Sequence, residues 1–492
     1  MAELIWRLRS GRTRLGAQGS DLSFGLLAGG ATAVVLGVTI TVSLQAACAL
    51  ALVVVVVALH QYNRAWGVTA LFVLWLLVPG IRRLFGLTTG FVNNDPLSLA
   101  PFLATCALAT NELLRVHVPT NIRRVLLLAA GGFAMGLPVG FVAGPRAAVF
   151  AFIAYAAGVM GAVLGIGEGT TVQASTLRRI LLFAIPPIAI YAIFQRAVHL
   201  PEWDQYWLDA SGFDSAGVSD GQKVRVFGTL NSPGTLAPLL GMTLLCYLTV
   251  HKARAITIAS AGVVAVALSY TFVRSAWFAL IAAGIAHVVV SRGASARIVL
   301  GSAAVIVAAT LALAPISPTA NEVLERFKTI QNLGRDDSAT TRSATLDSTL
   351  PTAISAPLGH GLGMAGESSK LSGTSDLRAP DNGYLGLMYQ VGPIGFLMVM
   401  GALGYILIAA WNGARARAPG EELRWLLFAI LIYLMVLLAA GDEFYGSHGV
   451  ILWFIGGSVM AYDFRRRQAE ASVRRQAEVS ARRAAETAAA SP

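Results

Sequence analysis

Residues 255–291 read AITIASAGVVAVALSYTFVRSAWFALIAAGIAHVVVS. Two apolar runs, 255–272 and 275–291, follow each other here almost without a break. Each run has about the length, roughly 17–25 residues, that a helix needs to cross the hydrocarbon core of a bilayer. The stretch therefore predicts two membrane spans joined by a very short turn, with Arg274 at that turn.

The rest of the chain has the same character. Of its 492 residues, 55% are hydrophobic and 13% are charged, and the mean hydropathy is +0.65. Soluble domains carry about 25% charged residues. We therefore expect an all-α polytopic membrane protein rather than a soluble enzyme with an anchor. The cysteines lie inside apolar runs and show neither a disulfide framework nor metal-ligand spacing; they are Cys48, Cys106 and Cys246.

Apolar runs of roughly 15–22 residues predict about fourteen transmembrane helices. They lie near 24–41, 45–60, 65–80, 97–114, 124–141, 147–166, 178–195, 234–250, 255–272, 275–291, 297–315, 383–410, 424–440 and 447–463. Because the first two are crowded together, thirteen or twelve spans are alternatives.

The distribution of charge predicts the topology. With the basic N-terminus, residues 1–23, in the cytoplasm, most Lys and Arg residues fall on the inside and most acidic residues on the outside. Residues 24–463 then form the transmembrane bundle. Two long polar loops, 196–233 (the first outer loop) and 316–380 (the second outer loop), lie outside. The net charge of +11 is explained in this way without a nucleic-acid partner.

Residues 464–492 form a basic cytoplasmic tail. The pattern Arg-Arg-x-Ala-Glu starts at Arg466, Arg474 and Arg482, so each first Arg precedes a Glu by four residues. This spacing favours a solvated helix. It would rest near anionic headgroups or dock a partner.

The first outer loop carries aromatic side chains and an arginine. Trp203, Tyr206 and Trp207 have the spacing of one face of a short helix. They are candidates either for an interfacial aromatic belt or for a platform that stacks on sugar rings. Arg225 follows near the mouth of the next span and is either a surface charge or a binding group.

Three outer arginines are candidates to bind an anion. Arginine grips phosphate through a planar fork of donors, and Arg225, Arg274 and Arg342 could converge on one pyrophosphate. An arginine at the membrane surface can also snorkel, which is the alternative for Arg274. Arg82 and Arg83 lie outside against the charge rule, and an ion pair of either with Asp95 would explain them.

Asp381 and Asn382 stand at the mouth of a late span. Asp381 could act as a base toward a sugar hydroxyl, although an Asp pKa near 3.9 makes a weak base unless the carboxylate is desolvated. A helix N-cap is the alternative. His360, in a Gly-rich turn, is a candidate substrate contact. The chain has no Walker, HExxH, CxxC or GxSxG pattern, and we expect no metal and no cofactor.

Residues 65–463 resemble the O-antigen polymerase and O-antigen ligase superfamily of bacterial envelope enzymes. The motifs that carry the resemblance are Pro79-Gly80-Ile81-Arg82-Arg83 with Asp95-Pro96-Leu97, Arg225-Val226-Phe227-Gly228-Thr229 with Ser232-Pro233, Arg274-Ser275, Arg342, Pro357-Leu358-Gly359-His360-Gly361-Leu362-Gly363, Asp381-Asn382-Gly383-Tyr384-Leu385, and Gly392-Pro393-Ile394-Gly395. Their order and their common outer side make the match more specific than any one of them.

The resemblance implies a C-type, metal-independent, inverting membrane glycosyltransferase in the bacterial cytoplasmic (inner) membrane, with its active site facing outward. Undecaprenyl-pyrophosphate-linked glycan would be donor and acceptor, and a chain-length regulator is a candidate protein partner. The arginines would hold the donor pyrophosphate, with Arg225 and Arg274 also stabilising the leaving group. The substrate contacts would be Trp203, Trp207, His360, Asn382 and Tyr384.

One departure from the family directs the choice of reaction. Family ligases place His before the Asn, where this chain has Asp381. We therefore expect a polymerase of O-antigen or exopolysaccharide repeat units, with Asp381 as the base. A ligase with another acceptor, a polysaccharide transporter or flippase, and a scaffold role are the alternatives.

Overall fold

The computed structural model describes residues 44–92, 95–167, 170–211, 216–217, 224–249, 255–293, 337–372, 382–416 and 420–489. Every regular element in these ranges is a helix, which confirms an all-helical fold. The predicted spans near 24–41 and 297–315 lie outside the described residues. Each of the other predicted spans falls on helical segments, and the span near 124–141 is divided between two of them.

The first half of the chain contains α2 (Leu44–Tyr62), α3 (Arg64–Thr89), η1 (Pro96–Leu99), α4 (Ala100–Arg115), α5 (Thr120–Ala134), α6 (Leu137–Ala143), α7 (Pro145–Ile166), α8 (Thr170–Ala197) and α9 (Glu202–Ser211). The second half contains α10 (Pro233–Tyr247), α11 (Ala255–Thr271), α12 (Arg274–Val290), α15 (Asp337–Ser355), η4 (Glu367–Leu371), α16 (Gly383–Arg415), α17 (Glu421–Leu437) and α18 (Gly446–Ala489).

Seven helical segments of the described chain are long and apolar enough to cross a membrane. They are Leu44–Tyr62, Arg64–Thr89, Pro96–Arg115, Thr120–Ala143, Pro145–Ile166, Ser175–Ala197 and Gly383–Arg415. The helices α10, α11 and α12 are apolar but shorter. The protein is thus a polytopic helical membrane protein, and the expected total of fourteen spans stays a prediction.

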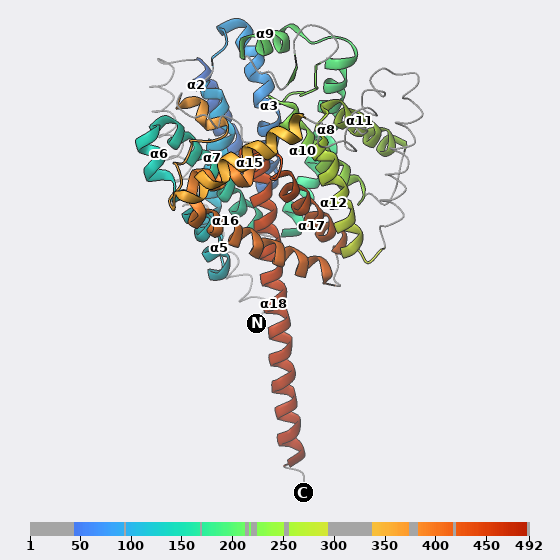
Figure 1. Cartoon of the computed structure of the whole chain (residues 1–492). Helices are drawn as coiled ribbons and strands as arrows, with labels where there is room; N and C mark the ends of the chain where they lie inside the picture. The colour runs from blue at the N-terminus through green and yellow to red at the C-terminus, as the bar shows by residue number, and fades with distance from the viewer. Residues whose placement is uncertain are drawn as a thin grey trace.

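The helix α18 runs through the centre of the bundle and packs along α7 (Figure 1). Glycines allow this close approach. A Cβ at Gly165 would lie 2.0 Å from the Phe454 carbonyl oxygen, and one at Gly457 would lie 1.9 Å from that of Ala162. Small residues at a contact let membrane helices approach backbone to backbone. The two helices form the axis around which the other helices pack.

The helix ends form two groups, one at each end of the bundle, and contacts join the ends within a group. At the end predicted to be inside, Arg178 donates to Thr249 Oγ1 at 3.4 Å and Arg292 donates to the Arg415 carbonyl at 3.3 Å. At the other end, which we call the outer end, α9 lies over the bundle (Figure 1). These pairings agree with the alternating helix directions predicted from charge.

Beyond the bundle, α18 continues as a straight exposed helix (Figure 1). Arg466 Nη1 lies 2.7 Å from Glu470 Oε1, as the four-residue spacing predicts. The helix projects along the bundle axis rather than lying across it (Figure 1). The described side chains of residues 467–483 are therefore all exposed.

Candidate functional site at the outer end

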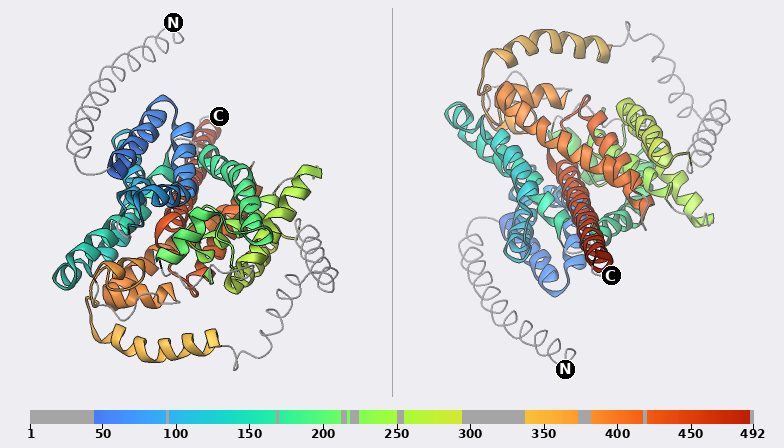
Figure 2. Two further views of the ribbon diagram at one scale, coloured as in Figure 1. Left: turned by 90° about the horizontal axis from the view of Figure 1, so that it is seen from above. Right: turned by 90° about the horizontal axis from the view of Figure 1, so that it is seen from below.

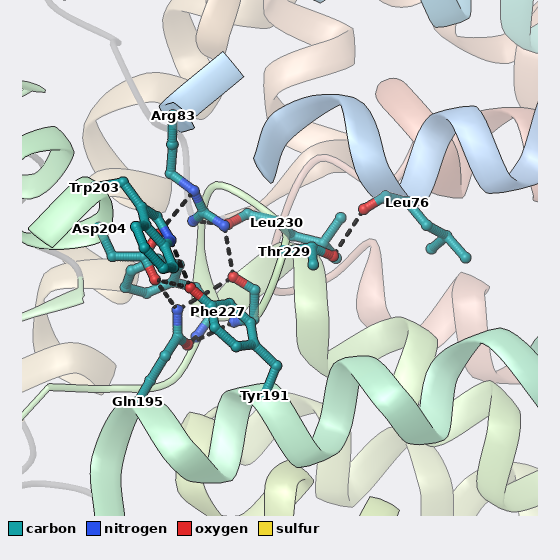
Figure 3. Close-up of polar contacts among 10 residues, drawn as sticks. Leu76, Arg83, Tyr191, Gln195, Trp203, Asp204, Phe227, Thr229 and Leu230 are labelled. Carbon is teal, nitrogen blue, oxygen red and sulfur yellow. Dashed lines mark hydrogen bonds and ion pairs between the residues drawn. The ribbon is translucent and has the colours of Figure 1, made fainter. Parts of the chain in front are cut away.

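A buried arginine from α3 anchors the end of the first outer loop (Figure 3). Arg83 Nη1 donates to the Leu230 carbonyl at 2.7 Å, and Nη2 donates to that of Gly228 at 2.6 Å. Its Nε lies 3.1 Å from Asp204 Oδ1. The guanidinium also lies over the Phe227 ring, 4.9 Å from the centroid. Arg83 therefore holds the Gly228–Leu230 turn in place.

Asp204 joins this turn to α8 and α9. Its Oδ2 accepts from Tyr191 Oη and from Gln195 Nε2, both at 2.6 Å. Gln195 Oε1 in turn accepts the backbone N–H of Gly228 at 2.8 Å. Buried charges are tolerated when they are paired and hydrogen-bonded in this way. The network fixes the loop segment that carries Arg225.

The expected ion pair with Asp95 is confirmed for Arg82, whose Nε lies 3.4 Å from Asp95 Oδ2. Arg83 instead pairs with Asp204, 121 positions along the chain by number. Sequence spacing carried no signal for this pairing, because the contact depends on how α9 folds back over α3 (Figure 1).

The aromatic face of α9 differs from the expected sugar platform. Trp207 is buried and packs on Phe227, with ring centroids 5.7 Å apart. Most of the Trp207 side chain is therefore engaged in packing, and a substrate contact at Trp207 stays a prediction. Trp203 is partly exposed and donates through Nε1 to Tyr191 Oη at 2.8 Å. A substrate contact at Trp203 stays a prediction.

The structure places Arg225 against the turn that carries Arg274. Arg225 Nε donates to the Thr271 carbonyl at 2.9 Å, and α12 begins at Arg274. Phe272 in this turn has φ +53°, a left-handed conformation that costs about 1–2 kcal/mol in a residue with a Cβ. The Arg196 guanidinium lies 4.9 Å from the centroid of the Phe272 ring. The turn is thus held by packing in a strained form.

Arg225 and Arg274 are both partly exposed. Arg225 therefore contacts the α11–α12 turn, and Arg274 begins the helix that follows this turn. Arg342, the third, lies in α15, and its side chain is outside what the structure describes. Pyrophosphate binding by the three stays a prediction.

The described part of the second outer loop is folded rather than extended. The helix α15 runs along the outside of the bundle (Figure 2). The turn that follows it, residues 357–363, packs against α16. Gly359 and Gly392 face each other across this contact with φ of +76° and +71°. A Cβ at Gly392 would lie 2.3 Å from the Pro357 carbonyl oxygen. The glycines of the two motifs therefore serve one close backbone contact.

His360 lies in this turn and is partly exposed. Its ring stacks on Tyr389, with centroids 4.4 Å apart, and its Nε2 lies 3.0 Å from the Thr352 carbonyl. A carbonyl only accepts, so Nε2 carries the hydrogen and Nδ1 is the ring atom that a substrate could meet. Its role as a substrate contact stays a prediction.

The α16 N-terminus has the expected cap. Asn382 Oδ1 accepts from the Leu385 backbone N–H at 3.1 Å, which is the N-cap geometry. Tyr384 Oη donates to the Met435 carbonyl at 2.7 Å and ties α16 to α17. Asp381 lies outside the described residues, so its role as base stays a prediction.

Sequence reasoning missed a polar cluster at the α17–α18 turn, residues 438–445. Asp442 Oδ2 accepts from Tyr155 Oη at 3.3 Å. Burial of the carboxylate is the largest cause that raises the pKa of Asp442 to about 7, and the Tyr155 hydrogen bond opposes it. Glu443 Oε2 forms an ion pair with His448 Nδ1 at 2.7 Å. The available signal was an acidic pair, Asp442-Glu443, between two apolar runs.

The site so assembled combines arginine forks, carboxylates and a capped helix end, which suits binding of an anionic donor and movement of a proton. Within the described ranges, no group of three or more His, Cys, Asp or Glu residues is placed to hold a metal ion.

The model of a family described as O-antigen ligase matches residues 257–400. The matched segment includes Arg274, Arg342, His360 and Asp381. Comparison with curated proteins gives no match.

Proposed function

Because the model of a family described as O-antigen ligase matches residues 257–400, we propose that the chain polymerises undecaprenyl-pyrophosphate-linked oligosaccharide repeat units. Members of this family are membrane enzymes of the glycosyltransferase type that act in O-antigen and polysaccharide biosynthesis. The reaction would take place at the outer side of the bacterial cytoplasmic membrane and yield O-antigen or exopolysaccharide.

The observation that carries the proposal is the meeting of Arg225 with the turn of Arg274 at the outer end. Two partly exposed guanidinium groups at one turn suit a pyrophosphate, which accepts bidentate charge-assisted hydrogen bonds. The same groups would stabilise the negative charge that grows on the leaving pyrophosphate. Arg342 is the third candidate for this role.

The proposed transfer is an inverting displacement. A carboxylate takes the proton of the acceptor hydroxyl, and Asp381 is the candidate that the family resemblance indicates. The acceptor oxygen attacks the anomeric carbon of the donor sugar from the face opposite the pyrophosphate. The bond from that carbon to the pyrophosphate oxygen breaks, and undecaprenyl pyrophosphate leaves with the electron pair.

A ligase is the second candidate, and the description of the matched family favours it. Both reactions use the same donor chemistry and differ in the acceptor. We prefer the polymerase because this chain has Asp381 at the position where family ligases have histidine.

Deletion of the gene separates these two functions. Loss of a polymerase leaves single repeat units on undecaprenyl pyrophosphate, whereas loss of a ligase leaves long chains that stay on the lipid. We expect single units, with long polymer restored by a plasmid copy of the wild-type gene. Long lipid-linked chains in the deletion strain would assign the protein to ligation instead.

The role of Asp381 is tested in the same strain. If Asp381 is the base, the Asp381→Asn variant, present in the membrane at wild-type amounts, makes little or no long polymer. Polymer of normal length from this variant would rule out Asp381 as the base.

A further inference from the structure

We propose that Asp442, in the α17–α18 turn, is the carboxylate that takes the proton from the acceptor hydroxyl. This inference rests on the proposed glycosyl transfer and names a proton acceptor other than Asp381.

The place of Asp442 is beside the capped end of α16. The Gly383 backbone N–H donates to the Leu438 carbonyl at 2.8 Å. A Cβ at Gly383 would lie 2.4 Å from the Gly441 carbonyl oxygen and 3.2 Å from the Asp442 Cα. The α17–α18 turn and the Asn382–Gly383 motif are therefore in direct backbone contact. Asp442 thus lies beside the N-terminus of α16, and the residue is partly exposed.

Asp442 is also linked to the second outer loop. Tyr155 Oη donates to Asp442 and accepts from Gln390 Nε2 at 3.1 Å. The Oε1 of the same Gln390 accepts the Gly363 backbone N–H at 2.8 Å. A Cβ at Gly366 would lie 3.4 Å from Asp442 Oδ2. Gly363 of the second outer loop and the Asp442 carboxylate thus belong to one hydrogen-bonded network.

Glu443 and His448 fix the other side of the turn. His448 Nε2 lies 3.0 Å from the carbonyl of Thr235, in the capping box that follows the first outer loop. Because a carbonyl only accepts, Nε2 donates there. A proton must also lie between His448 Nδ1 and Glu443 Oε2, 2.7 Å apart, since two lone pairs at that distance would repel. Both side chains are less than a tenth exposed. They are positioning residues for Asp442.

The charge environment suits a proton acceptor. The titratable groups that face Asp442 are Tyr155 from α7, Glu367 from η4, and Glu443 and Tyr445 from its own turn, and the two Glu residues contribute negative charge. The pKa of Asp442 is raised to about 7, first by burial, with the Tyr155 hydrogen bond opposing and Glu443 and Glu367 adding to the rise. A general base works best with a pKa near the operating pH, and an unperturbed Asp, near 3.9, does not meet this condition.

In the proposed step, the proton of the acceptor hydroxyl moves to Asp442 as the acceptor oxygen bonds to the anomeric carbon. The pyrophosphate leaves with the electron pair of the broken bond. Asp442 then returns the proton to outer water. Atoms and charge balance without a further reactant.

The experiment uses spheroplasts of the deletion strain, in which the outer face of the cytoplasmic membrane contacts the buffer. The initial rate at which lipid-linked glycan lengthens is measured in buffers between about pH 5.5 and 8.5. With the wild-type protein we expect the rate to rise with pH through a midpoint near 7, because the base must be deprotonated. With Asp442→Asn we expect a loss of about 100-fold or more, the range that general-base catalysis contributes. Glu202→Gln, an exposed carboxylate of α9, is the matched control and should behave as wild type.

Each outcome is decisive. If the wild-type protein does not lengthen lipid-linked glycan, the proposed function fails; if it does and Asp442→Asn equals it, only this inference is overturned. Should Asp442→Asn not accumulate in the membrane, Glu443→Gln decides. Removing the Glu443 charge lowers the pKa of Asp442, so the rate midpoint should move below that of wild type. A midpoint that stays in place or moves up would overturn the inference.

Discussion

Arg83 illustrates how an arginine near a membrane boundary can be structural. Its donors reach two backbone carbonyls and one carboxylate, and its side chain is 1% exposed. A side chain buried to this extent is not placed to reach a substrate. Arg225 and Arg274, by contrast, are partly exposed at a turn. Exposure thus divides these outer arginines into a structural residue, Arg83, and two candidate binding residues, Arg225 and Arg274.

The first prediction concerns the stability of the Arg83–Asp204 pair. Replacement by Arg83→Met leaves Asp204 charged and buried without its partner, and breaking a buried pair costs about 3–5 kcal/mol. We expect a clear fall in the thermal midpoint of the purified protein in detergent. Arg475→Met, in the exposed tail, is the control and should melt as wild type. Equal melting of the two variants would contradict the structural role of Arg83.

At the same scale, the sequence predicted the Arg82–Asp95 pair because the partners lie close in the chain. It could not predict the Arg83–Asp204 pair or the Asp442 cluster. Their partners come from helices far apart in sequence, and only packing brings them together. Burial of Trp207 was missed for the same reason, since its helical spacing says nothing of what covers it.

The second outer loop contacts the bundle where helices are interrupted. One span was expected near 124–141, and the structure divides it into α5 and α6. The carbonyl of Gly136, at the break, accepts the Leu362 backbone N–H at 2.8 Å. Hydrophobic runs predicted where helices lie, whereas these breaks depend on contacts that a run of apolar residues does not encode.

The second prediction concerns the seat of the second outer loop. Gly363 has φ +87°, and a Cβ there would lie 2.5 Å from backbone atoms of Ala147. We expect Gly363→Ala to release the loop and to speed its cleavage by protease added to spheroplasts. Gly262→Ala in α11 is the control, because nothing lies within 4 Å of its Cβ position. Unchanged cleavage of Gly363→Ala would contradict the proposed close contact of Gly363 with Ala147.

For the whole molecule, the two groups of helix ends agree with the topology inferred from charge. Apolar runs and positive residues carry this prediction, because the bilayer dictates both, and the side of the membrane on which each end lies stays a prediction. The outer group includes every described residue of the candidate site. The tail of α18 projects from the opposite end (Figure 1).

The third prediction tests this arrangement by cysteine labelling in spheroplasts with a membrane-impermeant maleimide. Glu202→Cys, on α9, should be labelled in intact spheroplasts. Glu478→Cys, in the tail, should be labelled only after lysis. The natural cysteines are buried or partly buried in apolar helices and should contribute a low background. Labelling of Glu478→Cys in intact spheroplasts would place the tail outside and reverse the topology.

The central claim is that the outer arginines hold the pyrophosphate of the lipid donor. Native mass spectrometry of the purified protein with undecaprenyl pyrophosphate measures this directly. We predict binding to the wild-type protein and to Arg475→Gln, and at least about tenfold weaker binding to Arg274→Gln, since one lost charge-assisted contact is worth about 1.5–3 kcal/mol. Equal binding by Arg274→Gln, Arg225→Gln and the wild-type protein would contradict the claim.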